Sequence, residues 1–139
     1  MSLGTAFNLD PQLENDSLFV TQLALCQVRL INDSQYPWFI LVPSVNHCVE
    51  IIDLNDMQQQ TLQKESAVLS QYIKSEFLPD KINIAAIGNK VRQLHIHHVA
   101  RFITDKAWPA PIWGHSAMVA YKKTQANELI THARNNLGE

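Results

Sequence analysis

Histidines are concentrated in the segment QLHIHHVAR, which runs from Gln93 to Arg101. Because side chains alternate between the two faces of a strand, a strand here would place His95 and His97 on one face with Gln93 and Arg101. The rise along a strand would separate the two imidazoles by about 7 Å. A neutral imidazole can attack phosphorus, and a histidine with an ordinary pKa has a useful neutral fraction at neutral pH. The spacing therefore fits nucleophilic catalysis, although it also fits a metal site or a polar strand face without a chemical role.

His98 falls on the opposite face of the same predicted strand, beside Leu94 and Ile96, which would point at the core. Buried polar groups usually find a hydrogen-bond partner. We therefore predict a structural role for His98, either bonded to a buried carbonyl or at a thinly covered edge of the sheet.

The bulk properties of the chain exclude several classes of function. A length of 139 residues fits one domain over residues 1–139, and a net charge of -2 gives no electrostatic reason to expect nucleic acid or a membrane as partner. Cys26 and Cys48 are too few for a disulfide framework, so we predict buried reduced thiols. The chain has no apolar stretch of about 18 residues and no basic and apolar leader at its N-terminus, which predicts a cytoplasmic protein.

The first half of the chain predicts a helix, a hairpin and a second helix. Asp10 and Pro11 are typical of a helix start, and this short helix would run to about Ser17. Strands over 25–31 and 38–43 would pair across the turn residues 32–35. A longer helix would begin at Asp53 or Asn55 and end near Phe77, with apolar residues at helical spacing: Met57, Leu62, Leu69, Ile73 and Phe77.

The second half predicts another hairpin and a final helix. Strands over 82–87 and 91–102 would flank the turn at Gly88, Asn89 and Lys90. Thr124 would cap a last helix whose inward residues are Ala126, Leu129, Ile130, Ala133 and Leu137. Two hairpins separated by one long helix indicate the α+β class: an antiparallel sheet with a long central helix and a C-terminal helix packed on it.

Residues 88–101, GNKVRQLHIHHVAR, resemble the signature of the histidine triad (HIT) superfamily, His-φ-His-φ-His-φ-φ with φ apolar. In this resemblance Gln93 takes the first histidine position, His95 the nucleophile position and His97 the third, which makes a Gln-His-His variant. His98 stands in an apolar position, and Arg101 matches a trailing basic residue. Gly88 and Asn89 match a Gly-Gln pair whose amide contacts a phosphate in the family.

The resemblance extends from about Leu9 to the end of the chain. Residues 32–44, NDSQYPWFILVPS, look like the family's nucleoside-binding hairpin, which implies that Asn32 or Asp33 holds ribose hydroxyls. Asn83 matches a second polar position near the nucleotide. The pattern is most similar to a bacterial subgroup in which GNxVxQLHxHxxxR is followed by WPxPxWG, here WPAPIWG over residues 108–114.

The resemblance implies a nucleotide-binding phosphoramidase or nucleotidyl hydrolase or transferase that works as a homodimer, paired by sheet extension and helix contact. His95 would attack the α-phosphorus of a nucleotide conjugate, and water would then release the nucleotide. Asn89 and backbone N–H groups would stabilise the phosphate charge, and His97 would contact the leaving group or the water. Arg101 would contribute to nucleotide binding. No cofactor or metal is required.

Gln93 keeps a second function open. Glutamine donates and accepts hydrogen bonds but cannot act as an acid, so an orienting role survives and a protonation role does not. The alternative is a nucleotide-binding or sensing module with little or no turnover. A third possibility is a metal site made of His95, His97 and either His115 or His47, for which no acidic or cysteine ligand stands at convincing spacing.

Three tryptophans also have alternative roles. Trp38 is predicted to lie in the core. Trp108 and Trp113 flank the prolines of a loop, where they would either pack as a rigid turn or form a substrate rim or dimer contact.

Overall fold

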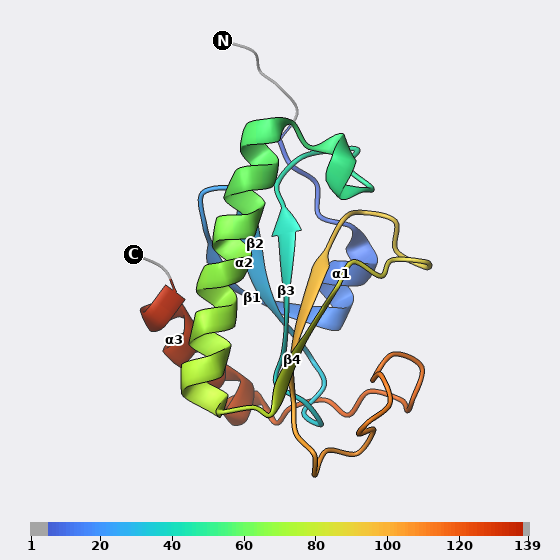
Figure 1. The fold of residues 1–139 in the computed structure, drawn as a ribbon, viewed down its shortest axis with the longest axis vertical. Coiled ribbons are helices and arrows are strands. Elements are labelled where there is room, and N and C mark those ends of the chain that lie inside the picture. Colours follow the sequence, from blue (N-terminus) through green and yellow to red (C-terminus); the bar gives the residue numbers. More distant parts are fainter. Residues whose placement is uncertain (1–5, 138–139) are drawn as a thin grey trace.

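A five-stranded antiparallel sheet organises the protein, which the computed structural model describes over residues 6–137. The strands lie in the order β1-β2-β3-β5-β4. Their bounds are Ser17–Gln22 for β1, Cys26–Ile31 for β2, Trp38–Pro43 for β3, Lys81–Ala85 for β4 and Ile96–Arg101 for β5. This arrangement confirms the predicted α+β class (Figure 1).

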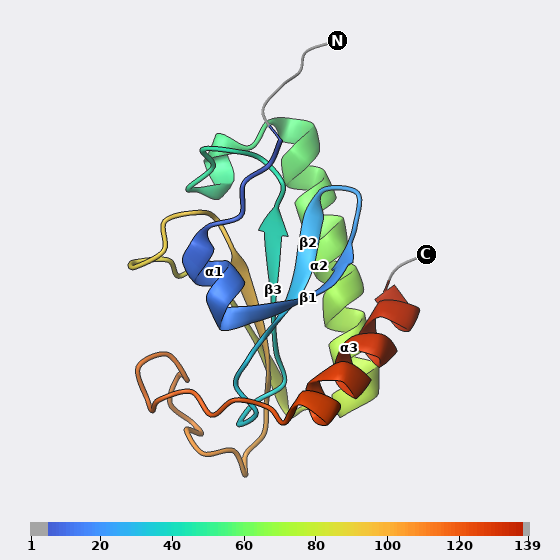
Figure 2. The ribbon, with the colours of Figure 1, turned by 180° about the vertical axis from the view of Figure 1, so that it is seen from behind.

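Helices cover the sheet from both sides. The long helix α2 (Asp56–Phe77) and the last helix α3 (Lys123–Leu137) lie on one face, and the short helix α1 (Pro11–Asp16) lies on the other (Figure 2). A 3-10 turn over Ile51–Asp53 precedes α2. A long loop from residue 102 to residue 122 joins β5 to α3 and packs with α1 against the second face.

The two faces of β5 belong to two separate apolar cores. Ile96 and Ala100 join the core under α2, whereas Val99 joins the core under α1 and the long loop. In register, Ile40 of β3 stands opposite His97, and Phe39 stands opposite His98. The predicted alternation along this strand is therefore confirmed from residue 96 onward.

Both predicted hairpins form, and each departs from its predicted outline. The hairpin of β2 and β3 has the expected strands and gains a third, β1, which the sequence analysis did not predict. Strand β5 starts at Ile96 rather than at residue 91, because the backbone N–H of Leu94 donates to Cys48 of the loop after β3. Residues 86–95 therefore form a loop rather than a tight turn with a strand.

The helices end close to their predicted bounds. Asn55 caps α2, and Leu78 in the left-handed conformation ends it before Pro79. Met57 is 76 % exposed, although it was predicted among the apolar residues at helical spacing. Leu62 follows it by five positions, and over that spacing a helix rotates to about 140° from the starting direction, so Met57 points away from the buried side of α2. Helix α3 begins at Lys123, so Thr124 lies inside its first turn and is not its cap.

Two further predictions concern the cysteines and membranes. Cys26 and Cys48 are buried free thiols, as predicted, and burial raises the pKa of each. None of the helices in residues 6–137 combines the length and the apolar character needed to cross a membrane.

Candidate active site

His95 lies just before β5, where the main chain fixes the state of its ring. Its Nδ1 is 2.8 Å from the backbone carbonyl oxygen of Gln93. Because a carbonyl only accepts, the hydrogen of a neutral ring sits on Nδ1, and Nε2 keeps its lone pair. Burial lowers the pKa of His95, and the Gln93 bond and the charge of Asp10 partly oppose this shift. The ring is thus neutral at pH 7, with a nucleophilic Nε2.

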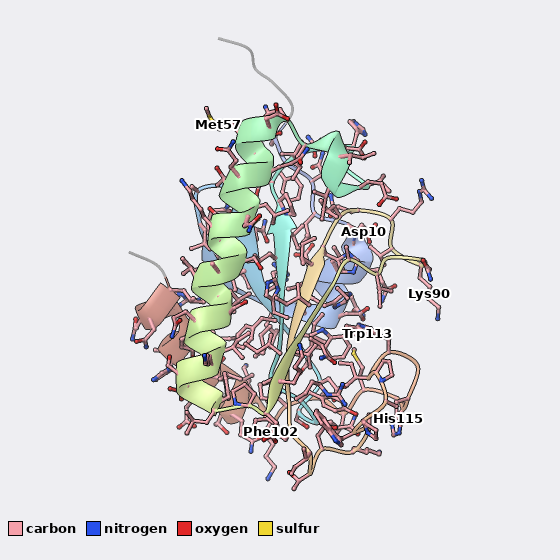
Figure 3. All side chains as sticks on the ribbon, in the orientation of Figure 1. Asp10, Met57, Lys90, Phe102, Trp113 and His115 are labelled. Carbon is pink, nitrogen blue, oxygen red and sulfur yellow. The ribbon has the colours of Figure 1, made fainter. Side chains whose placement is uncertain are left out.

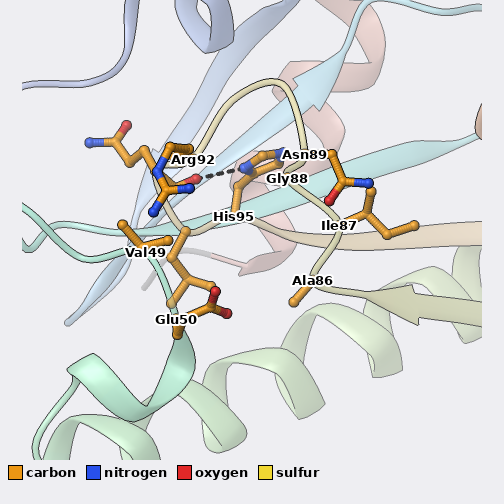
Figure 4. Close-up of a pocket in the computed structure, with 10 residues that line it drawn as sticks. Val49, Glu50, Ala86, Ile87, Gly88, Asn89, Arg92 and His95 are labelled. Carbon is orange, nitrogen blue, oxygen red and sulfur yellow. Dashed lines mark hydrogen bonds between the residues drawn. The ribbon is translucent and has the colours of Figure 1, made fainter.

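A polar cavity of about 220 Å³ opens beside this ring (Figure 4). The loop after β4 and the loop after β3 form its walls. The polar side chains that line it come from Glu50, Asn89, Arg92, Gln93 and His95. The cavity therefore offers amide and guanidinium donors to an anionic group next to Nε2.

Gly88 allows the loop after β4 to approach the His95 ring. A Cβ atom added to Gly88 would lie 2.6 Å from the carbonyl oxygen of Val91 and 3.4 Å from Cε1 of His95. Only glycine fits a contact with backbone at that distance. Gly88 and Asn89 were both predicted from the family resemblance, and both line the cavity with His95.

His97 is the second imidazole of the site, and Trp38 holds it in one tautomer. The indole Nε1–H of Trp38 donates to Nδ1 of His97 at 2.9 Å. Because an indole only donates, Nδ1 must carry a lone pair, and the ring hydrogen sits on Nε2, 3.3 Å from the carbonyl oxygen of Ile87. Burial, with a smaller effect of neighbouring His95, lowers the pKa of His97 to about 3. His97 is therefore a neutral donor and not an imidazolium acid.

The rings of the site lie closer together than strand spacing predicts. The centroids of His95 and His97 are 4.8 Å apart, against the predicted 7 Å, because His95 precedes the strand and its ring leans toward its neighbour. Trp113 belongs to the long loop after β5 (labelled in Figure 3). Its ring meets that of His97 edge to face, with the ring centroids 5.3 Å apart. Trp38 was predicted as core only. It is buried and also contacts the site, and the face that it shares with His97 across β3 and β5 is the signal that was missed.

Gln93 does not share a strand face with the two histidines, contrary to prediction. It precedes β5, and its side chain turns to the N-terminal segment, where Oε1 accepts from the backbone N–H of Asp10 and Nε2 donates to the carbonyl of Asn8. Its orienting effect on His95 comes through its backbone carbonyl. The side chain therefore holds local geometry without facing the imidazoles.

Arg101 and Asn83 lie on the predicted face but are bound to the protein itself. The guanidinium of Arg101 is 2 % exposed and forms two hydrogen bonds with the carboxylate of Asp105. It also donates to Oδ1 of Asn83 and to the carbonyl of Ala110. Burial raises the pKa of the Asp105 carboxyl, but the hydrogen bonds that it accepts, above all from Arg101, lower this pKa to about 2. Arg101 thus organises the loop after β5, and its burial does not support the predicted nucleotide contact.

Asn32 and Asp33 tie the β2–β3 turn to the chain before α3. Oδ1 of Asn32 accepts from the backbone N–H of Tyr121, and Oδ1 of Asp33 accepts from the backbone N–H of Gln35 and Val119. Asp33 is 2 % exposed. A ribose could reach its carboxylate only after the segment before α3 moved away, and neither Asn32 nor Asp33 lines the cavity beside His95.

His98 has the structural role that was predicted for it. Its Nδ1 lies 3.0 Å from the carbonyl oxygen of Ile96, and its Nε2 lies 2.7 Å from Oγ of Ser66 on α2. The carbonyl fixes the hydrogen on Nδ1, so the serine hydroxyl donates to Nε2. Burial lowers the pKa of His98 to about 4, and the ring is a neutral link between β5 and α2.

Of the residues considered for a metal site, His95 and His97 lie together, but neither His115 nor His47 joins them. Within residues 6–137, no three His, Cys, Asp or Glu side chains lie close enough to hold a metal ion. His115 is exposed in the long loop, and His47 lines a separate cavity with Asn46 and Gln93.

Comparison with known proteins gives one family match and several similar structures. Residues 12–104 match the HIT domain family. No curated protein gives a significant match. Histidine triad proteins of known structure from Bradyrhizobium japonicum and Marinobacter aquaeolei VT8 are 40 % and 41 % identical, each over 96 % of this chain, with a TM-score of 0.93. They are covered over 99 % and 97 % of their own lengths.

Two further structures are similar at different levels. A histidine triad protein from Sinorhizobium meliloti 1021 is 37 % identical, over 94 % of this chain and 97 % of its own, with a TM-score of 0.91. A hypothetical histidine triad nucleotide-binding protein from Sulfolobus tokodaii is 16 % identical, over 91 % of this chain and 89 % of its own, with a TM-score of 0.65. The second shares the fold alone.

Proposed function

The chain belongs to the HIT domain family, and we propose that it binds a nucleotide conjugate and cleaves it at the α-phosphate. The nucleotidyl group would be transferred to water or to another acceptor, as in the reaction of a phosphoramidase. A single domain over residues 1–139 would carry this activity, without a metal or cofactor.

One observation carries the proposal: His95 presents a neutral ring with its lone pair on Nε2 at a polar cavity. The Gln93 carbonyl fixes the tautomer, and burial keeps the ring unprotonated at pH 7. Asn89 and Arg92 line the same cavity and supply donors for non-bridging phosphate oxygens. A nucleophile, an anion-binding wall and access from solvent thus coincide at one place.

The reaction would proceed in two displacements at phosphorus. In the first, the Nε2 lone pair of His95 forms the P–N bond while the bond from phosphorus to the leaving group breaks, and the leaving group departs with that electron pair and takes a proton from water. In the second, water attacks phosphorus, the P–N bond breaks with its pair returning to Nε2, and the water's proton passes to solvent. His97 would donate a hydrogen bond from its Nε2–H, which lies 3.3 Å from the Ile87 carbonyl oxygen in the structure, to a phosphate oxygen or the leaving group, and as a neutral ring it would not transfer a proton.

Mass spectrometry of the intact protein tests this chemistry. After incubation with nucleoside phosphoramidates and dinucleoside polyphosphates, we expect a nucleotidyl adduct that maps to His95 and is absent from His95→Ala. The control is His115→Ala, which removes an exposed histidine of the long loop. Full hydrolysis by His95→Ala would refute the assignment of the nucleophile.

A nucleotide sensor without turnover is the second candidate, and the state of the site favours it in one respect. The pKa of His97 is about 3, and the Gln93 side chain is bound to the N-terminal segment, so neither supplies an acid for a poor leaving group. Calorimetry with AMP and GMP separates the two functions. Tight binding with neither adduct nor product would establish the sensor.

We also propose a homodimer formed at the β4 edge. Strand β4 ends the sheet, and its Ile84 is 52 % exposed beside a groove along α2. A second copy could pair at this edge and cover the apolar side chain. Light scattering after gel filtration should give a dimer mass for the wild type and a monomer mass for Ile84→Lys, and an unchanged dimer would rule out this edge.

A further inference from the structure

Residues 6–10 cross the molecule next to His95 as an extended segment, which we call the N-terminal strap. Asn46 accepts from the backbone N–H of Asn8 and donates to the carbonyl of Ala6. Gln93 donates to the carbonyl of Asn8 and accepts from the N–H of Asp10. Between these polar contacts, Phe7 and Leu9 pack on the core under α1. The strap is therefore fixed along its whole length.

Gln93 holds the strap and the nucleophile at the same time. Its backbone carbonyl fixes Nδ1–H of His95 at 2.8 Å, and its side-chain Oε1 fixes the N–H of Asp10 at 2.8 Å. A primary amide offers one acceptor and two donors, which suits an extended backbone. Asp10 is therefore connected to the His95 ring through one residue.

The charge on His95 changes during the proposed reaction. The free ring is neutral, but a ring bonded to phosphorus at Nε2 and to hydrogen at Nδ1 carries one positive charge. Gln93 hydrogen-bonds both to Asp10 and to the His95 ring, so the negative charge of Asp10 is held on the Nδ1 side of His95, in the direction that favours a positive ring. Its charge is thus placed where it opposes the cost of forming the adduct in a buried position.

We propose that Gln93 is a positioning residue whose side chain holds Asp10 beside His95, so that the carboxylate stabilises the cationic nucleotidyl-imidazole. The inference rests on the proposed function for its catalytic consequence. In this role Gln93, at the first triad position, transfers no proton. Its side chain holds Asp10, whose carboxylate carries the negative charge.

Asp10→Asn isolates the charge from the structure. Asparagine caps a helix as well as aspartate does, so the bond to the N–H of Gln12 and the start of α1 are preserved. The matched control is Asp16→Asn, which removes one carboxylate at the other end of the same helix. Gln93→Ala releases the strap while keeping the Gln93 backbone carbonyl.

Titration of the His95 ring by NMR is the first measurement, because protonation produces the same ring charge as the adduct. Besides Asp10, the groups that face the ring are Glu50, Arg92 and His97, and all three stay unchanged in these variants. We expect the pKa of His95 to fall in Asp10→Asn and in Gln93→Ala, and to stay constant in Asp16→Asn. An unchanged pKa in Asp10→Asn overturns the inference.

Adduct formation is the second measurement. Asp10→Asn should slow it roughly three- to tenfold, the size expected for one solvent-screened interaction between two charges. The double variant Asp10→Asn/Gln93→Ala should form the adduct little more slowly than either single variant, since both changes abolish the same effect of Asp10 on His95. Additive losses would refute the route through Gln93. If the wild type forms no adduct at all, the proposed function fails, and the titration still decides whether Gln93 places the charge.

Discussion

His97 and His98 are neighbours in the chain and lie on opposite sides of β5. Both are almost fully buried, and burial keeps both neutral. His97 contacts Trp38, Trp113 and His95, on the side of the sheet that carries the core under α1 and the long loop. His98 hydrogen-bonds to Ser66 of α2 and to the Ile96 carbonyl of its own strand, on the side closed by α2. Identical side chains thus serve a site and a core, because the partner on each face decides what the ring can do.

Breaking the buried ion pair between Arg101 and Asp105 should have the largest effect on the free energy of unfolding. Replacement of Arg101 by Met leaves the Asp105 carboxylate buried without its cation, which costs about 3–5 kcal/mol of unfolding free energy. Urea denaturation measures the loss, and Arg92→Met, on an exposed residue, serves as the stability control. A stable Arg101→Met protein with weakened nucleotide binding would restore Arg101 as a ligand residue.

Acid should destabilise both sides of β5. The pKa of His98 is about 4 in the fold and about 6.5 when unfolded, so its contribution is intact above pH 6.5 and is lost as the pH falls toward 4. The loss at pH 4 is on the order of 3 kcal/mol. His98→Asn should flatten the dependence of stability on pH in this window by one proton. An unaltered slope would mean that His98 is charged in the fold.

Removing the Trp38 donor should affect the His97 side alone. Trp38→Phe leaves Nδ1 of His97 without its hydrogen bond and loses buried volume, which costs about 2 kcal/mol. The 1H–15N NMR pattern of His97 should then change from the Nε2–H tautomer to a mixture. If the tautomer persists, the Ile87 carbonyl, and not Trp38, sets it.

Removing the Ser66 hydroxyl should have the smallest effect. Ser66→Ala removes the donor to Nε2 of His98, and the half-buried position lets water replace it, so we expect a loss of about 1 kcal/mol. Adduct formation on His95 should be unchanged. The control is Ser70→Ala, from the same groove. Lost adduct formation in Ser66→Ala would show that the two sides are coupled.

The sequence predicted the elements better than the contacts of individual polar residues. Alternation along β5 correctly separated His97 from His98, since a strand allows only two directions. It failed at Gln93, because the strand starts at Ile96 and a loop residue obeys no alternation. Arg101, Asn32 and Asp33 were predicted as ligand contacts from family positions, but the loop after β5 occupies the hydrogen bonds of Arg101. The distant segment before α3 occupies those of Asn32 and Asp33.

The residue types and their periods by themselves determined the α+β class and the bounds of α2 and β3, whereas the association of Gly88 and Asn89 with His95 was predicted only from the family resemblance. The class and these bounds depend on local propensity and on which face of each element is apolar. Only the tertiary structure decided which atoms meet: the Trp38 indole on Nδ1 of His97, the Gln93 carbonyl on Nδ1 of His95, and Asp10 behind it. The Trp38 and Asp10 contacts join segments distant in the chain, and the Gln93 carbonyl meets the ring because residues 93–95 lie in a loop rather than in the strand. Tautomer, pKa and charge placement depend on these contacts, and no local pattern records them.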